Sequence, residues 1–256
     1  MGTGAITQYV DVAQLVLYLF WIFFAGLIYY LVRENHREGY PMETEDGRRG
    51  VTGWPVPRPK TYLLPHGGEK TVPDGWRETR QFAAEPMHRW AGAPLEPAGD
   101  PMRAGVGPGS WAERADVPDV TPHGEPKIVP LRVAGSDFGV SGKDVDPRGL
   151  PAIGADGEVG GTVRDLWLDR SEMMFRFLEV EVGDGQGGTR RVLLPSNFAR
   201  VKADGVHVAS ILGAQFAGVP GTRSPDQVTL LEEEKVMAYY GAGTLYAEPH
   251  RAEPAL

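Results

Sequence analysis

The segment V12-A-Q-L-V-L-Y-L-F-W-I-F-F-A-G-L-I-Y-Y-L-V32 decides how this chain is organised. It contains no charged side chain, and Gln14 is its only strongly polar residue. At about 1.5 Å rise per residue, a helix of this length covers roughly the 30 Å hydrocarbon core of a bilayer. Apolar side chains cover every face of that helix instead of one stripe, which disfavours the alternative of a buried helix in a soluble protein. The sequence therefore predicts a transmembrane helix over residues 12–32.

The flanks of this segment predict its orientation. Residues 1–11 contain no Lys or Arg, so a cleaved signal peptide, which begins with a basic stretch, is not favoured. Arg33 and Arg37 follow the apolar run, and both are candidates for contact with anionic lipid headgroups. Because basic residues accumulate on the cytoplasmic side, we expect residues 1–11 in the periplasm and the remainder of the chain in the cytoplasm.

The composition of the whole chain excludes several functional classes. Gly 34 and Pro 22 indicate many turns and few long helices, and Cys 0 rules out disulfides and thiolate metal sites. A formal net charge of -8, with no basic stripe, argues against a nucleic-acid partner. The six His residues lack metalloenzyme spacing, and the sequence predicts no metal site.

The chain after the apolar segment divides into two regions. Residues 33–148 are rich in Pro and Gly and contain only short apolar runs, so we expect an extended cytoplasmic segment that packs on partner subunits. From residue 149 to 256 the pattern changes to short alternating runs divided by turns, which is typical of a small β-barrel. The predicted strands are residues 160–168, 175–182, 190–194 and 200–208.

Two local features refine the second region. In the strand over 175–182, Leu178, Val180 and Val182 are expected on one face, with Phe177, Glu179 and Glu181 on the other. A short helix is expected from about Leu231 to Tyr240, and its start is open between a cap at Ser224 and a strand through residues 228–230. Three consecutive acidic residues, 232–234, favour a solvated helix face.

Several motifs, in this order along nearly the whole chain, resemble the H subunit of the purple bacterial photosynthetic reaction centre. The shared order carries the resemblance, since no single motif is decisive. The motifs are F20-W-I-F23, A25-G-L-I-Y-Y30, R37-E-G-Y-P41, P59-K-T-Y62, L64-P-H-G67, G99-D-P-M102, G105-V-G-P108, S110-W111, R176-F-L-E-V-E181 and L230-L-E-E233.

The resemblance implies a fold and an assembly. The fold is a single N-terminal transmembrane helix followed by a mainly β cytoplasmic domain with a small PRC-type barrel and a short C-terminal helix. Such a chain carries no pigment, packs beside the L and M subunits in the intracytoplasmic membrane, and caps their quinone sites. Bacteriochlorophyll, bacteriopheophytin, quinones and non-haem iron are then expected on the partners, with a light-harvesting ring and anionic lipid as further contacts. Tyr40, with Arg33 and Arg37, is a candidate lipid or interface residue.

The resemblance also implies that protons travel through this chain to the reduced secondary quinone. His123 and Glu125 are the candidate proton entrance, since an imidazole titrates near neutral pH. Relatives carry a second His at the position of Glu125, so this entrance departs from the family pattern. An ordinary exposed turn is the alternative.

Deeper proton-transfer candidates are Asp169, Glu172 and Arg176, which match acidic residues and an Arg that the family places near the quinone pocket. If residues 169–176 include a helical turn, Glu172 and Arg176 lie four apart and can form an ion pair. An ordinary ion pair on a loop is the alternative.

Two functions from other classes compete with this interpretation. A membrane-tethered PRC-barrel adaptor, unrelated to photosynthesis, shares the anchor and the barrel but leaves residues 62–68 and 99–111 without a role. A membrane-bound hydrolase or oxidoreductase is disfavoured because the sequence contains no nucleophile constellation or cofactor loop, and no catalytic site is expected.

Overall fold

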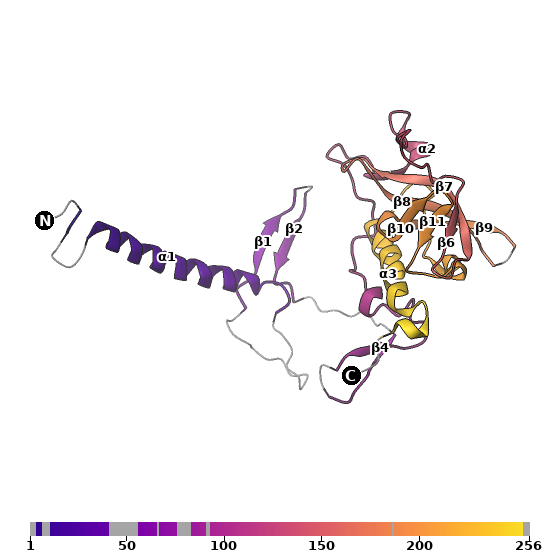
Figure 1. The fold of residues 1–256 in the computed structure, drawn as a ribbon. Coiled ribbons are helices and arrows are strands. Elements are labelled where there is room, and N and C mark those ends of the chain that lie inside the picture. Colours follow the sequence, from indigo (N-terminus) through magenta and orange to yellow (C-terminus); the bar gives the residue numbers. More distant parts are fainter. Residues whose placement is uncertain are drawn as a thin grey trace. The chain divides into compact units, whose positions relative to one another are not determined.

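The structure is a computed structural model that describes residues 4–6, 11–40, 56–65, 67–75, 83–90, 93–185 and 187–252. The chain divides into two compact units, residues 1–80 with 89–93, and residues 81–88 with 94–256 (Figure 1). Parts of the expected extended segment, residues 41–55 and 76–82, lie outside the described residues.

The predicted transmembrane helix is confirmed as a helix long and apolar enough to span a membrane. Helix α1 (Val12–Asn35) extends three residues beyond the predicted end. Asp11 caps its first turn, because the Asp11 carboxylate accepts the Gln14 N–H at 2.7 Å. No residue of α1 is buried within the chain, so its apolar surface is available to lipid or to other helices.

The C-terminal end of α1 is tied to a two-stranded hairpin. The hairpin consists of β1 (Lys60–Leu63) and β2 (Glu69–Val72). Arg37 donates to both carboxylate oxygens of Glu34 at 2.8 Å, to the Arg58 carbonyl at 2.8 Å and to the Val72 carbonyl at 3.3 Å. One guanidinium therefore links the end of the helix to β2 and to the residues just before β1.

The second unit is mainly β, as predicted. Its elements are β3 (Ala84–Pro86), β4 (Leu95–Pro97), β5 (Ile128–Pro130), α2 (Leu131–Ala134), β6 (Pro151–Ile153), β7 (Val159–Asp169), β8 (Met174–Gly183), β9 (Thr189–Pro195), β10 (Ala199–Lys202), β11 (Gly205–Val208) and α3 (Leu230–Tyr246). Seven strands form one sheet in the order β10-β11-β6-β7-β8-β9, with β5 paired to β7, while β3 and β4 form a separate hairpin. Among the described residues no ladder joins β9 to β10, so hydrogen bonds do not close the sheet into a ring.

The predicted strands match β7, β8 and β9 to within one residue at each end. The run predicted over 200–208 is two strands, β10 and β11, because a turn at residues 203–204 folds it back on itself. Leu178, Val180 and Val182 are buried as expected, but Phe177 and Glu179 are buried as well. Both faces of β8 are therefore covered at its centre.

Residues upstream of 149 belong to this unit's core. Ile128, Val129 and Leu131 are buried, and β5 lies antiparallel to the end of β7. This segment covers the outer side of the sheet where a simple alternating pattern predicts solvent. The compact unit thus begins well before the region of alternating sequence.

A buried polar network fixes that segment to the sheet. Glu179, 2% exposed, accepts from Arg132 at 2.9 Å, from Arg191 at 2.7 Å and from the Trp167 indole N–H at 3.1 Å. Arg132, at α2, also donates to Asp165 at 2.9 Å. The burial of a carboxylate is tolerated here because both of its oxygens have charged or N–H donors.

Helix α3 begins at a capping box that the sequence analysis did not identify. The Thr229 hydroxyl accepts the Glu232 N–H at 3.1 Å, and the Glu232 carboxylate accepts the Thr229 N–H at 2.9 Å. The cap is therefore Thr229 instead of Ser224, and the helix continues six residues past the expected end at Tyr240.

Two adjacent tyrosines of α3 give a stability test. Tyr240 is fully buried between the rings of Phe198 and Phe216, and its hydroxyl has no hydrogen-bond partner in the described part of the chain. Tyr239 donates to the Gln215 carbonyl at 2.9 Å. Since an unsatisfied buried hydroxyl costs roughly 1 kcal/mol or more, Tyr240→Phe should keep or raise the thermal unfolding midpoint, while Tyr239→Phe should lower it. Melting curves of the detergent-solubilised chain measure both, and a lower midpoint for Tyr240→Phe would contradict the arrangement.

Candidate functional site

The candidate site is centred on Asp169, the last residue of β7, whose side chain is fully buried. One carboxylate oxygen accepts the N–H groups of Ser171 and Glu172 at 2.9 and 3.0 Å. The other oxygen accepts no hydrogen bond from the described residues, but Lys127 Nζ and Arg176 Nε each lie 3.7 Å from it. Asp169 is thus a buried carboxylate held between two cations without close contact to either.

The turn after Asp169 differs from the helical turn considered from the sequence. Residues 170–173 join β7 to β8, and Asp169 pairs directly with Met174 across the hairpin. Glu172 is exposed on this turn, and Arg176 lies on β8, where its ion pair is with Asp169. The ion pair between Glu172 and Arg176 that a helix would allow is therefore replaced by one to Asp169.

The predicted proton entrance lies on a neighbouring hairpin, residues 119–127. Its base is closed by the hydrogen bond from the Lys127 N–H to the Asp119 carbonyl at 2.9 Å. His123 is exposed at the tip, beside Gly124, whose φ of +82° suits glycine. Within the hairpin, the Thr121 N–H donates to the Glu125 carbonyl at 2.8 Å, which makes the tip a tight turn.

Two contacts join this hairpin to the Asp169 turn. The Arg170 N–H donates to the Lys127 carbonyl at 2.9 Å, and the Arg170 side chain lies 3.4 Å from the Glu125 carboxylate. The structure therefore brings the predicted entrance, His123 and Glu125, next to the predicted deeper groups, Asp169 and Arg176.

Three further residues belong to the site and were not predicted. Lys127 lies between two carboxylates, 3.6 Å from Asp119 and 3.7 Å from Asp169. Glu233, near the start of α3, is half-buried and interacts electrostatically with Arg176 and Asp169. Asp119, Lys127, Asp169, Arg176 and Glu233 are called the Asp169 cluster below.

Burial raises the pKa of Glu233 to about 6. Arg176 and Arg114 oppose this shift, while the carboxylates of Asp119 and Asp169 add to it. The expectation that residues 232–234 form a solvated face is therefore wrong for Glu233. A helical spacing could have identified it, since Val236 and Tyr240, three and seven residues later, are both buried.

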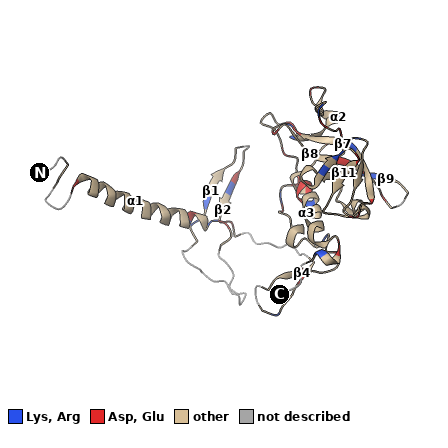
Figure 2. Cartoon of the chain, viewed as in Figure 1, with Lys and Arg blue, Asp and Glu red and all other residues tan. Residues whose placement is uncertain are grey.

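The two neighbours of Glu233 have other roles. Glu232 completes the capping box, and Glu234 lies 3.7 Å from Arg114 and accepts the Ala112 N–H at 3.4 Å. Figure 2 shows the acidic residues gathered on the first turns of α3. Only the middle carboxylate of the three is directed toward the cluster.

Exposed apolar side chains lie on the same segments as the cluster. Val117 and Val120 flank Asp119 and are 56% and 46% exposed, and Met173 and Met174 follow the Asp169 turn at 67% and 46%. These side chains leave apolar surface exposed on the segments that carry the charged cluster.

The candidate interface residues lie at the end of α1. Arg33 is exposed, and the Tyr40 ring stacks on the His36 ring with centroids 4.0 Å apart. Arg37 has its guanidinium committed to Glu34 and two backbone carbonyls, so Arg33 is the more accessible of the two predicted cations.

Two family models match this chain. The model described as photosynthetic reaction centre, H-chain N-terminal region matches residues 4–133, just over half of the sequence. The model of the PRC-barrel domain matches residues 142–215, which contain β6 to β11. The hairpin over 119–127 lies in the first matched region and Asp169 in the second, so the cluster is assembled from both.

The shifted Glu233 pKa predicts a pH dependence of stability. A carboxyl group with a pKa of about 6 in the folded chain and 4.5 when exposed binds its proton more tightly when folded. The contribution of Glu233 to the free energy of unfolding is therefore full below pH 4.5 and is lost as the pH rises through 6. Glu233→Gln should show a smaller loss of stability over this window than the unmodified chain.

Unfolding midpoints between pH 4 and 7.5 measure the difference. Glu181→Gln, which removes a carboxylate paired with Arg164 on the surface of β8, is the matched control. Parallel pH curves for Glu233→Gln and the unmodified chain would show that Glu233 is not buried as described.

Proposed function

The chain belongs to the H-chain family of photosynthetic reaction centres, and on this premise we propose that it caps the quinone side of the L and M subunits and conducts protons to the reduced secondary quinone. It is a non-catalytic subunit in this proposal, and the pigments, quinones and non-haem iron are held by its partners. The observation that carries the proposal is the row of ionisable groups from His123, exposed at a hairpin tip, to the half-buried Glu233.

The proposed route begins at His123, whose imidazole is exposed to bulk water at the tip of the hairpin. Glu125 and Arg170 connect the hairpin tip to the turn that starts at Asp169. Beyond them, Glu233 has a pKa of about 6, so it exchanges protons near neutral pH while partly shielded from water. Waters between these groups would carry the proton where side chains do not touch.

Two functions are assigned, one to the cations around Asp169 and the other to Glu233 and Glu172. Arg176 and Lys127 hold the buried Asp169 charge, and this fixed arrangement keeps the electrostatic environment of the route constant. Glu233, and Glu172 on the exposed turn, are the groups that gain and lose protons. The exposed methionines and valines around them form the surface that meets the quinone side of the L and M subunits.

We propose a location in the intracytoplasmic membrane, with α1 anchoring the chain and the mainly β unit in the cytoplasm. Arg33, exposed at the end of α1, is the residue proposed to meet anionic headgroups, and Tyr40, which stacks on His36 just after the helix, is a further proposed interface residue. A light-harvesting ring would meet the lipid-facing surface of α1. The rival function, a PRC-barrel adaptor, accounts for residues 142–215 but leaves the match over residues 4–133 unexplained.

Electron-transfer kinetics test the proposed route. Glu233→Gln and Glu172→Gln keep the shape of each side chain and remove its titratable proton. Electron transfer to the primary quinone should be unchanged, while the proton-coupled second transfer to the secondary quinone should slow by about tenfold for Glu233→Gln and less for the exposed Glu172→Gln. Flash kinetics of the whole complex from pH 6 to 9 measure both steps.

Glu181→Gln is again the control and should behave as the unmodified complex. Unaltered second-transfer kinetics in Glu233→Gln and Glu172→Gln would remove both carboxylates from the route, whatever their burial.

Zinc inhibition tests the proposed entrance. The Glu125 carboxylate lies 3.4 Å from Arg170, and His123 is the only imidazole on residues 119–127. Imidazole is a favoured ligand of Zn²⁺, so we expect weaker inhibition of proton uptake than in relatives with two His at this position. Glu125→His should tighten inhibition by Zn²⁺ through a second nitrogen ligand.

The measurement is a Zn²⁺ titration of the proton-coupled second electron transfer in both forms. His123→Ala within Glu125→His should remove the gain. If the unmodified complex already responds at the zinc concentration that inhibits Glu125→His, the entrance lies elsewhere.

A further inference from the structure

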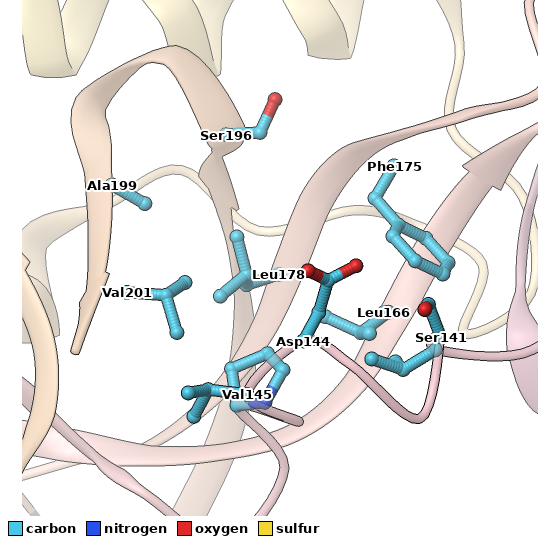
Figure 3. A pocket seen from close by; sticks show the side chains of 11 residues that line it. Ser141, Asp144, Val145, Leu166, Phe175, Leu178, Ser196, Ala199 and Val201 are labelled. Atoms are coloured by element: carbon cyan, nitrogen blue, oxygen red, sulfur yellow. The ribbon is translucent and has the colours of Figure 1, made fainter. Parts of the chain in front are cut away.

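A cavity of about 390 Å³ lies outside the Asp169 cluster, beneath the segment 139–147, which is called the strap below. Its floor is formed by Leu166 and Leu178, which face each other across β7 and β8 and are 2% and 3% exposed. Figure 3 shows the lining side chains from the strap on one side and from the sheet on the other. They are Val140, Ser141, Asp144, Val145, Pro147, Leu166, Phe175, Leu178, Ser196, Ala199 and Val201.

The strap is attached to the sheet by apolar contacts. Val140 packs against the core at one end, and Pro147 is buried at the other. Between them the Asp144 N–H donates to the Ser141 carbonyl at 3.0 Å, a bond within the strap. Within the described residues, no backbone hydrogen bond joins residues 139–146 to a strand. The cavity roof can therefore adjust to an occupant without breaking a ladder.

One charge is directed into this apolar space. The Asp144 carboxylate points between Leu178 and Phe175 (Figure 3). Among the described residues, no Lys, Arg or His forms an ion pair with Asp144, and no lining residue is a cation. The Ser141 hydroxyl lies on the same side of the cavity. The cavity thus combines an apolar floor with an unpaired anion at its edge.

We propose that this cavity binds a small organic cation, a compound with an apolar body and one protonated amine. The apolar body would pack on the Leu166 and Leu178 floor and would remove the Val145, Val201 and Phe175 side chains, which are exposed or half-buried in the chain, from water. This burial would supply most of the affinity. The ammonium group would pair with Asp144 and hydrogen-bond to Ser141, and this contact selects cations over neutral or anionic analogues.

Size and donor set argue for this class over others. A volume of about 390 Å³ is near the lower end of small-molecule pockets, so the occupant is small. A divalent metal is not favoured, because a single carboxylate is one ligand where Ca²⁺ takes six to eight oxygens. This site is independent of proton delivery, since no residue of the Asp169 cluster lines it.

Three matched probes test the proposal on the full detergent-solubilised chain: 4-phenylbutylamine, 4-phenylbutanol and 4-phenylbutyrate. Saturation-transfer NMR titrations should give the tightest saturable binding for the amine, weaker binding for the alcohol and the weakest for the carboxylate. Asp144→Asn should lower the affinity for the amine by about threefold to fivefold, to near the affinity for the alcohol. This is the effect expected for one partly exposed charge pair.

Two variants complete the test. Val201→Trp, at a lining position 40% exposed, fills the cavity and should abolish saturable binding of the amine and the alcohol, which also separates it from uptake into micelles. Asp137→Asn, an exposed carboxylate upstream that does not line the cavity, should leave all three affinities unchanged. Equal binding of the three probes, amine binding unaffected by Asp144→Asn, or binding that survives in Val201→Trp would each overturn the proposal.

Discussion

The contact between Arg132 and Glu179 is the interaction on which the mainly β unit depends. Glu179 lies at the centre of β8 with almost no exposure, and a carboxylate in that position is stable only with donors on both oxygens. Arg132, two residues after β5, donates to Asp165 and to Glu179, which lie 33 and 47 residues later in the chain. The segment that contains Arg132 covers the outer side of the sheet and brings the hairpin over residues 119–127 beside Asp169. Arg132 is also nearly the last residue of the first family match, so this contact joins the two matched regions.

Two carboxylates in this unit are buried, and the free-energy cost of removing each from water is offset in a different way. Glu179 has close donors on both oxygens. Within the described part of the chain, Asp169 has hydrogen-bond donors on one oxygen only, and its other oxygen lies between cations at 3.7 Å. The first arrangement favours a rigid core. The second leaves capacity for a water or a hydroxyl group, which is what a route for protons requires.

How much of this the sequence predicts depends on the separation of the interacting residues. The spanning helix and three of the strands follow from local patterns, and the structure matches them closely. The alternating pattern does not predict that Glu179 is buried, because its partner Arg132 lies 47 residues away and no local signal connects them. The partial burial of Glu233 could have been predicted from its helical spacing to Val236 and Tyr240. The run of three acidic residues instead favoured a solvated helix face. Motif resemblance predicted Asp169 and Arg176, but the turn between them depended on β pairing that only the structure gives.

Arg37 gives the membrane anchor a property beyond attachment. An arginine at the end of a spanning helix usually extends along the helix to reach headgroups, and so absorbs differences in bilayer thickness. Here its guanidinium is held by Glu34 and by carbonyls 21 and 35 residues downstream. The end of the helix is therefore held to the hairpin, which carries Leu63, 80% exposed. A change in the tilt of α1 would therefore turn the hairpin with it, because a single side chain holds the two together.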